Sequence, residues 1–276
     1  MLNRFRNLIQ KYAVISAVAI AFLFYAIMDV TGRLFSLIPE SLVRDYAYQI
    51  VSLIYPVLLA VIFGFGYAYK GGSFAKGLKC GIFTIVLDSI VLAASLVSFL
   101  SDDSVVWNPW YLIIYGLLRV IGIAVREESI FRATIQNLLA NKYAHSVKGV
   151  WITAIISAVI FGLIHAMNVF VGIEPLPAII QSIVNVGAGL LSAAIYLRCE
   201  NIWALIALHT FTDGSSLFTA LFFDGSGNSA ADVINTISWP TLFFGAAMAA
   251  VGAFLLRPSK CREIIERNAA KCEHRI

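Results

Sequence analysis

A run of charge lies inside an otherwise apolar part of the sequence, between Arg126 and Arg132. Charged side chains are costly in an apolar segment, so the run is either a functional site or the polar end of a helix at an interface. In a helix, Glu128 and Arg132 lie four residues apart on one face and can form an ion pair. Glu127 points about 100° away from Glu128, so the arginine can hold one glutamate while the other is free for proton transfer.

Two histidines lie in other apolar segments, each one helical turn from a notable neighbour. His165 follows Phe161, His209 precedes Asp213, and the spacing of four residues places each pair on one helix face. A lone histidine in a membrane helix is more often a hydrogen-bond partner than a ligand, and Phe161 alone indicates core packing. Together with Glu127, however, the two imidazoles could either bind zinc with an open position for water or activate water directly.

The segments that carry these groups belong to a strongly apolar chain. Of its 276 residues, 60% are hydrophobic and 13% are charged, whereas roughly a quarter of a soluble domain is charged. A membrane-spanning helix needs about 20 mostly apolar residues, and eight segments meet that requirement. The sequence therefore predicts an all-α, polytopic bundle of about eight transmembrane helices. The eight segments are roughly residues 13–32, 47–69, 77–100, 110–131, 150–171, 177–198, 202–223 and 233–256.

Basic residues are unevenly distributed between the predicted helices, and this bias sets orientation. Lys and Arg lie before the first helix, in every second connection and after the last helix, whereas the other connections are mainly acidic. We therefore expect a multi-pass protein of the cell membrane with both termini in the cytoplasm. The chain divides into residues 1–109 with three helices, 110–223 with the charged groups, and 224–276 with the last helix and a basic tail.

The depth of each candidate group follows from this orientation. At 1.5 Å per residue, His209 lies roughly 10 Å from the cytoplasmic start of its helix, close to the level of Glu127. His165 comes out deeper by the same count. A kink, or a longer cytoplasmic half of its helix, would be needed for the three side chains to meet.

The overall charge and the cysteines do not indicate other kinds of site. The formal net charge is +4, but the basic residues lie between helices and at the chain ends, so no nucleic-acid partner is expected. The four cysteines lack the spacing of a disulfide framework or a metal site. They are Cys80, Cys199, Cys261 and Cys272.

Two further expectations concern residues away from the motifs. Asp88 and Arg119 fall at matching depths in adjacent predicted helices, so we expect a buried structural pair, the alternative being separate hydration in a cavity. Residues 259–276 carry Ile264 and Ile265 among charged residues. This pattern predicts a short helix held on the cytoplasmic surface by anionic lipid, the alternative being a frayed end.

Three ordered motifs in separate predicted helices share the pattern of one protein family. They are Glu127-Glu128-xxx-Arg132, Phe161-xxx-His165 and His209-xxx-Asp213. They resemble the motifs of the CPBP family, which comprises the type II CAAX prenyl endopeptidases and the bacteriocin-processing or immunity proteins also called the Abi domain. The resemblance covers roughly residues 110–223.

The resemblance implies a role for each catalytic side chain. In the family, the first glutamate and the first histidine are thought to activate water, which here implies Glu127 and His165. The second histidine and the residue four positions later, commonly Asn, are thought to hold the oxyanion, which implies His209 and Asp213. An ionised Asp cannot donate to an oxyanion. Asp213 could instead orient His209, be protonated or bind a metal.

Two functions remain open at this point. The first is a glutamate-dependent intramembrane endopeptidase that cleaves a peptide or membrane-protein tail near the cytoplasmic face, with Glu128 and Arg132 fixing the helix and Phe161 packing the site. It would work with zinc on Glu127, His165 and His209, or with water activated by Glu and His alone. The second is a non-catalytic immunity or scaffold protein of the same fold. The motifs His-Glu-x-x-His, Gly-x-Ser-Gly and Gly-x-Gly-Asp of other intramembrane proteases are missing from the sequence.

Overall fold

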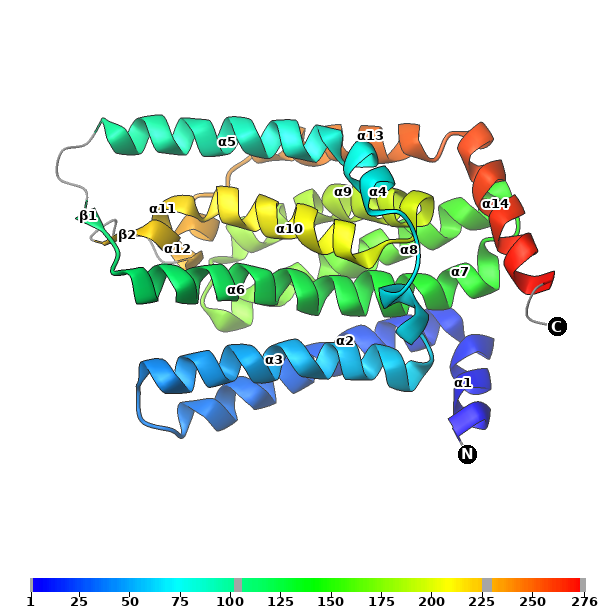
Figure 1. Cartoon of the computed structure of the whole chain (residues 1–276), viewed down its shortest axis with the longest axis horizontal. Helices are drawn as coiled ribbons and strands as arrows, with labels where there is room; N and C mark the ends of the chain where they lie inside the picture. Colours follow the sequence, from blue (N-terminus) through cyan, green and yellow to red (C-terminus); the bar gives the residue numbers. More distant parts are fainter. Residues whose placement is uncertain (1, 102–105, 225–229, 274–276) are drawn as a thin grey trace.

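The computed structural model describes residues 2–101, 106–224 and 230–273, and it confirms the predicted all-α membrane fold (Figure 1). Its elements are α1 (Leu2–Lys11), α2 (Ala13–Ser36), α3 (Leu42–Phe63), the 3-10 helix η1 (Gly66–Tyr69), α4 (Phe74–Cys80), α5 (Ile82–Leu100), β1 (Val106–Trp107), α6 (Trp110–Glu128), the π-helix η2 (Ser129–Gln136), α7 (Asn137–Tyr143), α8 (Val147–Ala166), the 3-10 helix η3 (Met167–Val171), α9 (Pro175–Cys199), α10 (Ile202–Ser216), α11 (Phe218–Phe222), β2 (Phe223–Asp224), α12 (Ala230–Asn235), α13 (Thr241–Leu255) and α14 (Pro258–Glu273).

The number of membrane spans is smaller than predicted when judged by helix length and composition. Within the described residues, α2, α3, α8 with η3, and α9 are long and apolar enough to cross a membrane. Two bent pairs, α4 with α5 at 66° and α13 with α14 at 60°, raise the count to six. The predicted count of eight is therefore not confirmed. The two helices that fall short are α6, which carries four charged residues, and α10, which has 15 residues.

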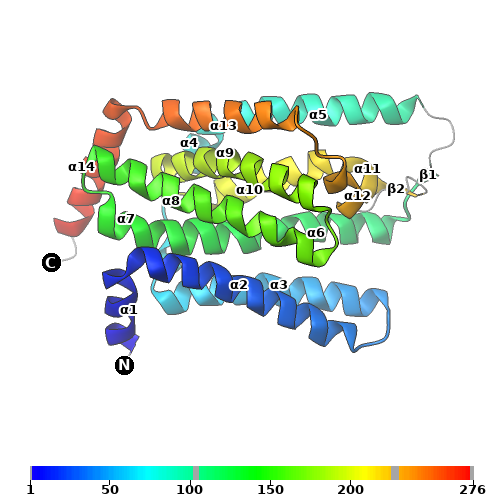
Figure 2. The same ribbon diagram turned by 180° about the vertical axis from the view of Figure 1, so that it is seen from behind.

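The helices form layers along one common direction. Figures 1 and 2 show the hairpin of α2 and α3 along one side, α5 and α13 on the opposite side, and α8, α9 and α10 between them. The two described ends of the chain, α1 and α14, lie crosswise at the same end of the bundle. The antiparallel pair of β1 and β2 lies at the other end. The motif helices α6, α8 and α10 are therefore surrounded by other helices, which can shield their polar groups from lipid.

The central helix α9 is held between α8 and α13 by close contacts at glycines. Gly162 of α8 faces Ser182 and Val186 of α9, and Gly187 of α9 faces Gly245 of α13. A Cβ atom at Gly162 or Gly187 would overlap the facing atoms. Small residues at such positions let membrane helices approach closely. The position of α9 relative to its two neighbours is thus narrowly fixed.

The charged run of the sequence passes from α6 into the π-helix η2. In a π-helix each turn is widened so that residues five apart are bonded. Two side chains complete the loosened backbone: Thr134 Oγ1 donates to the Ser129 carbonyl at 2.9 Å, and Asn137 Nδ2 donates to the Ala133 carbonyl at 2.9 Å. All eight residues of η2 are buried, so the packing around this wide turn holds it in place.

The predicted pair of Asp88 and Arg119 does not form. Asp88 is buried and accepts a hydrogen bond of 2.6 Å from Thr212 Oγ1 of α10. The reason is the order of the helices, because α5 packs on α10, and α10 in turn packs on α6. Arg119 is half-buried on α6, and among the described residues no ion pair or hydrogen bond joins it to Asp88. The prediction was wrong because it considered only depth in the membrane, and the two residues lie on helices that do not face each other.

The predicted surface helix at the end of the chain is present as α14, but it is held by protein contacts. Cys261 and Ile264 are buried against the bundle. Arg267 donates to the Leu197 carbonyl at 2.6 Å and pairs with Glu200 at 3.1 Å. A cation at this position stabilises the carbonyl end of α9. One side of α14 therefore packs on helices, and attachment of its other side to anionic lipid stays a prediction.

Candidate active site

The two neighbouring glutamates at the end of α6 have different surroundings. The Glu128 side chain is 1% exposed and its Oε2 lies 3.2 Å from Nε of Arg132, which is fully buried. The expected ion pair is therefore present. The Glu127 side chain is 19% exposed and points away from this pair. A buried ion pair that loses one partner leaves an uncompensated charge, so Glu128 and Arg132 depend on each other.

Glu128 also holds the ring of His209 on α10. Nδ1 of His209 lies 2.9 Å from Oε1 of Glu128. Asp213 Oδ2 is 3.7 Å from Nε2 of the same ring, which is beyond hydrogen-bond distance. Glu128 therefore holds the Nδ1 side of the ring and links Arg132 to His209 in one chain of contacts, while Asp213 lies within ion-pair distance of Nε2; that Asp213 orients the ring stays a prediction.

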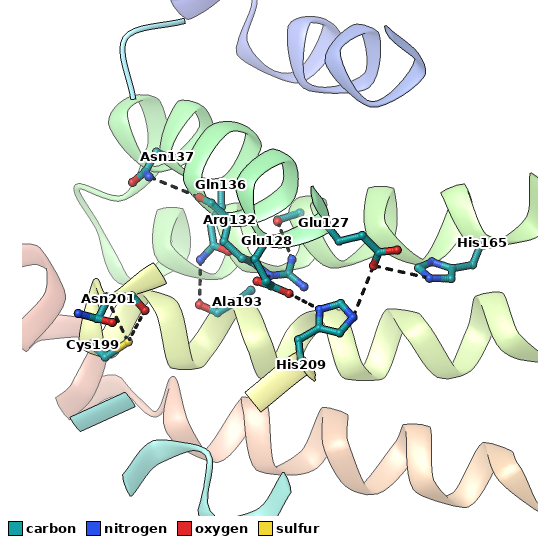
Figure 3. Close-up of polar contacts among 11 residues, drawn as sticks. Glu127, Glu128, Arg132, Gln136, Asn137, His165, Ala193, Cys199, Asn201 and His209 are labelled. Carbon is teal, nitrogen blue, oxygen red and sulfur yellow. Dashed lines mark hydrogen bonds and ion pairs between the residues drawn. The ribbon is translucent and has the colours of Figure 1, made fainter. Parts of the chain in front are cut away.

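Glu127 lies between the two motif histidines, as Figure 3 shows. Its Oε2 is 3.7 Å from Nε2 of His209 and 4.0 Å from Nε2 of His165. His165, expected to lie too deep, reaches this level because α8 extends past the start of α10 toward α14. This corresponds to the longer half-helix considered from the sequence. Glu127, His165 and His209 therefore converge in one site.

The hydrogen bonds of the two rings decide which nitrogen faces Glu127. Nδ1 of His165 lies 2.8 Å from the Phe161 carbonyl, and because a carbonyl only accepts, this nitrogen must carry the proton. Nδ1 of His209 likewise faces a carboxylate oxygen. In both rings Nε2 is left for chemistry. Glu127 Oε2, which is buried and makes no hydrogen bond within the described residues, faces both of these nitrogens.

Phe161 packs at the centre of these groups. Its ring centroid lies 4.8 Å from that of His165 and 6.4 Å from that of His209. The guanidinium carbon of Arg132 lies 4.8 Å from the same ring centroid, a distance at which cation and ring attract. Phe161 thus separates the buried ion pair from His165, in agreement with the packing role expected for it.

A cavity of about 100 Å³ opens beside His209 between α5, α9, α10 and α13. That volume accommodates a few water molecules. Its apolar wall includes Leu191, Ile195 and Met248, and Glu128 and His209 also line it. The remaining polar side chains on its surface are Thr84, Asn185, Ser192, Thr212 and Asp213.

The comparison with known families agrees with this arrangement. Residues 109–215 match the family model described as type II CAAX prenyl endopeptidase, Rce1-like. This segment is a CPBP-family domain. The match contains all three motifs and confirms the resemblance seen in the sequence. Comparisons with curated proteins and with solved structures gave no significant match. The chain is thus a multi-pass membrane protein that contains a CAAX-protease-like segment at residues 109–215.

The CPBP domain offers a possible zinc ligand set in Glu127, His165 and His209. Each ring has its Nδ1 occupied by an acceptor, as is common for histidines that bind metal through Nε2. Within the described part of the chain, however, no three His, Cys, Asp or Glu side chains are arranged closely enough to hold a metal ion. The zinc version of the site stays a prediction, and it requires these three side chains to draw closer together.

Several side chains that support the CPBP site were not singled out from the sequence. Ser157 accepts a hydrogen bond of 3.4 Å from Arg132, and Phe131 packs edge-on against Phe161 with centroids 5.0 Å apart. Asn185 lines the cavity from α9. The signal for Asn185 was available, because an amide in a predicted membrane span is expensive unless it faces a polar space. Ser157 and Phe131 are ordinary residues for a membrane helix, so only the folded contacts reveal them.

Proposed function

We propose that the chain is a glutamate-dependent intramembrane endopeptidase that cleaves a peptide or a membrane-protein tail near the cytoplasmic face. The observation that carries this proposal is the buried Oε2 of Glu127, which forms no hydrogen bond with the described residues and faces Nε2 of both His165 and His209. A carboxylate oxygen that accepts no hydrogen bond from the described residues and lies beside two imidazoles suits a general base. Membership of the CPBP domain in a protease family supports the reaction class.

The proposed reaction begins with a water molecule between Glu127 and His165. Glu127 takes a proton from this water while the water oxygen bonds to the carbonyl carbon of the scissile peptide, and His165 holds the water through Nε2. The electron pair of the C=O double bond moves onto the oxygen. The carbon–nitrogen bond then breaks, and Glu127 returns the proton to the leaving amine, so that protons and electrons balance.

His209 is proposed to stabilise the oxyanion. In its protonated form, Nδ1–H donates to Glu128 and Nε2–H points toward the reacting centre, where a positive ring favours the developing negative charge. Glu128 and Arg132 keep this ring in place. Asp213, at 3.7 Å from Nε2, can attract the positive ring but in its ionised form cannot donate to an oxyanion.

The test compares Glu127→Gln with the wild-type chain. Membranes from cells making each form are searched by mass spectrometry for a protein that accumulates uncleaved, and the purified proteins are given an internally quenched peptide ending in a farnesylated CAAX sequence. Glu127→Gln keeps the side-chain shape and removes the base, so cleavage in either assay should stop. The matched control is Glu40→Gln, the same exchange at an exposed residue, which should cleave normally. Equal cleavage by Glu127→Gln and wild type would reject the proposal.

The same assay separates the two forms of water activation. Loss of cleavage with a chelator, restored by added zinc, would select the metal version with Glu127, His165 and His209 as ligands. Cleavage that is indifferent to chelators would select direct activation by Glu and His.

The second candidate function is a non-catalytic immunity or scaffold protein. The observation that favours it is Asp213, which stands where the family commonly has Asn. This candidate predicts that no protein accumulates when Glu127 is changed, and that the peptide is not cleaved by the wild-type chain.

A further inference from the structure

The cavity beside His209 is lined by three polar side chains that form no hydrogen bond within the described residues. Asn185 and Ser192 of α9 and Thr84 of α5 line it, and none of them forms a hydrogen bond with another residue that the structure describes. Thr212, in contrast, is bonded to Asp88. An uncommitted amide in a membrane-spanning helix is costly and indicates a path or binding position for a polar ligand. Of the three, Asn185 is the strongest donor, with two N–H groups.

The packing of α9 places Asn185 at the depth of the catalytic motifs. Gly162, three residues before His165, packs against Val186, the residue after Asn185. Gly189, one turn further along α9, packs against the ring of Phe161. Asn185 therefore lies on α9 beside the turn that carries Phe161 and His165. It also lines the same cavity as His209.

The proposed reaction lacks a second hydrogen-bond donor to the oxyanion, and Asn185 can supply it. A tetrahedral intermediate is usually held by two hydrogen-bond donors. His209 provides one, but Asp213, in the position four residues later, has no N–H group. Glu128 is already committed to Arg132 and His209. Among the described side chains that line the cavity, Asn185 alone has an amide.

We propose that Asn185 donates an Nδ2–H hydrogen bond to the carbonyl oxygen of the scissile peptide, and to the oxyanion formed from it, together with His209. This inference rests on the proposed function and names a further residue of the same site. The close contacts of α9 with α8 and α13 fix the stretch of backbone that carries Asn185 before substrate binds. A donor on a fixed backbone needs less reorganisation to meet an oxyanion than one on a moving segment.

The test measures kcat and KM of Asn185→Ala and Asn185→Asp with the farnesylated quenched peptide, or with the tail found in the membrane comparison. Removal of one oxyanion donor lowers kcat by about 10²–10³-fold, while KM should change little because the bond strengthens in the transition state. Asn185→Asp keeps the size of the side chain but loses the N–H group, so it should be equally slow. The matched control is Asn141→Ala on the exposed surface of α7, which should retain wild-type kcat.

Each outcome decides a distinct point. If Glu127→Gln is inactive while Asn185→Ala keeps a kcat within about threefold of wild type, Asn185 is not an oxyanion donor and only this inference falls. If Asn185→Asp retains full kcat, donation by the amide is excluded. If Asn185→Ala raises KM and leaves kcat unchanged, the residue binds substrate without assisting the reaction, and the inference is again wrong. Melting temperatures equal to wild type would show that lost activity is not lost folding. If Glu127→Gln cleaves as fast as wild type, the proposed function itself fails.

Discussion

The buried pair of Glu128 and Arg132 makes the sharpest prediction about stability. Both side chains are at most 1% exposed, and their charged atoms are 3.2 Å apart. Arg132→Met keeps an unbranched side chain but leaves the Glu128 charge without its cation. Breaking a buried pair in this way costs about 3–5 kcal/mol. At about 2–4 °C per kcal/mol for a chain of this size, Tm should fall by roughly 6–20 °C.

A second substitution isolates the charge from the other contacts of Arg132. Glu128→Gln removes the buried charge, so the double variant Glu128→Gln/Arg132→Met should be more stable than the sum of the two single changes predicts. Coupling between touching residues is about 0.5–3 kcal/mol. The recovery should be partial, because Arg132 also donates to Ser157 at 3.4 Å and contacts the ring of Phe161. The measurement is thermal unfolding of the purified proteins in one detergent at one heating rate, followed by tryptophan fluorescence.

The matched control is an ion pair with the same spacing in an exposed position. Asp29 and Arg33 lie four residues apart on α2 with charged atoms 2.8 Å apart, and the Arg33 side chain is 78% exposed. Such surface pairs contribute little because water screens them, so Arg33→Met should leave Tm unchanged within error. If Arg132→Met lowers Tm no more than Arg33→Met does, or if the double variant shows simple additivity, the reasoning about the buried charge is refuted.

Two further predictions concern support and orientation. Thr212→Val removes the hydroxyl that donates to Asp88 at 2.6 Å, so the free energy of unfolding should fall by about 1–3 kcal/mol. The control is Thr236→Val, the same exchange at an exposed residue. Equal Tm values for the two variants would contradict a stabilising role for the hydrogen bond between Thr212 and Asp88. For orientation, Cys261 is buried and should resist thiol reagents, so Ser259→Cys at an exposed position is the useful label. An impermeant reagent should modify it in inverted vesicles above the background of the unaltered chain, and modification in intact cells would place the C-terminal tail outside.

The helical class and the main contacts of the motifs could be predicted from local patterns. Composition and segment length are sufficient to predict membrane helices, because every backbone group in a bilayer must be bonded within its own segment. The ion pair of Glu128 and Arg132 follows from a spacing of four residues. That Glu127, His165 and His209 come together was expected from the motifs, and their convergence depends on packing between distant helices. Spacing within one helix therefore predicts contacts well.

Contacts between helices were harder to predict, and the errors have physical causes. The hydrogen bond between Glu128 and His209 was not expected, and it forms because α6 brings Glu128 to the Nδ1 side of the ring. Asp88 and Arg119 fail to pair because α10 packs on both α5 and α6. Counting residues along a helix predicts how deep a side chain lies in the membrane. It does not predict which helices are neighbours in the plane of the membrane. The neighbours of a helix are determined by side-chain packing between helices, which the sequence of a single segment does not predict.

The π-helix η2 restricts the number of residues in this part of the chain, and substitutions of single side chains do not test that restriction. Upstream of it, Glu128 must meet Arg132 and His209, and at its far end Gln136 donates to the carbonyl of Ala193 on α9 at 2.8 Å. Each residue of an α-helix turns the chain by about 100° and advances it by about 1.5 Å. A one-residue insertion or deletion within η2 would therefore rotate Gln136 away from α9 or Arg132 away from Glu128. Residues of η2 can be exchanged for others of similar shape, but their number is fixed. Insertions and deletions among related chains should therefore fall in the connections between helices and not within η2.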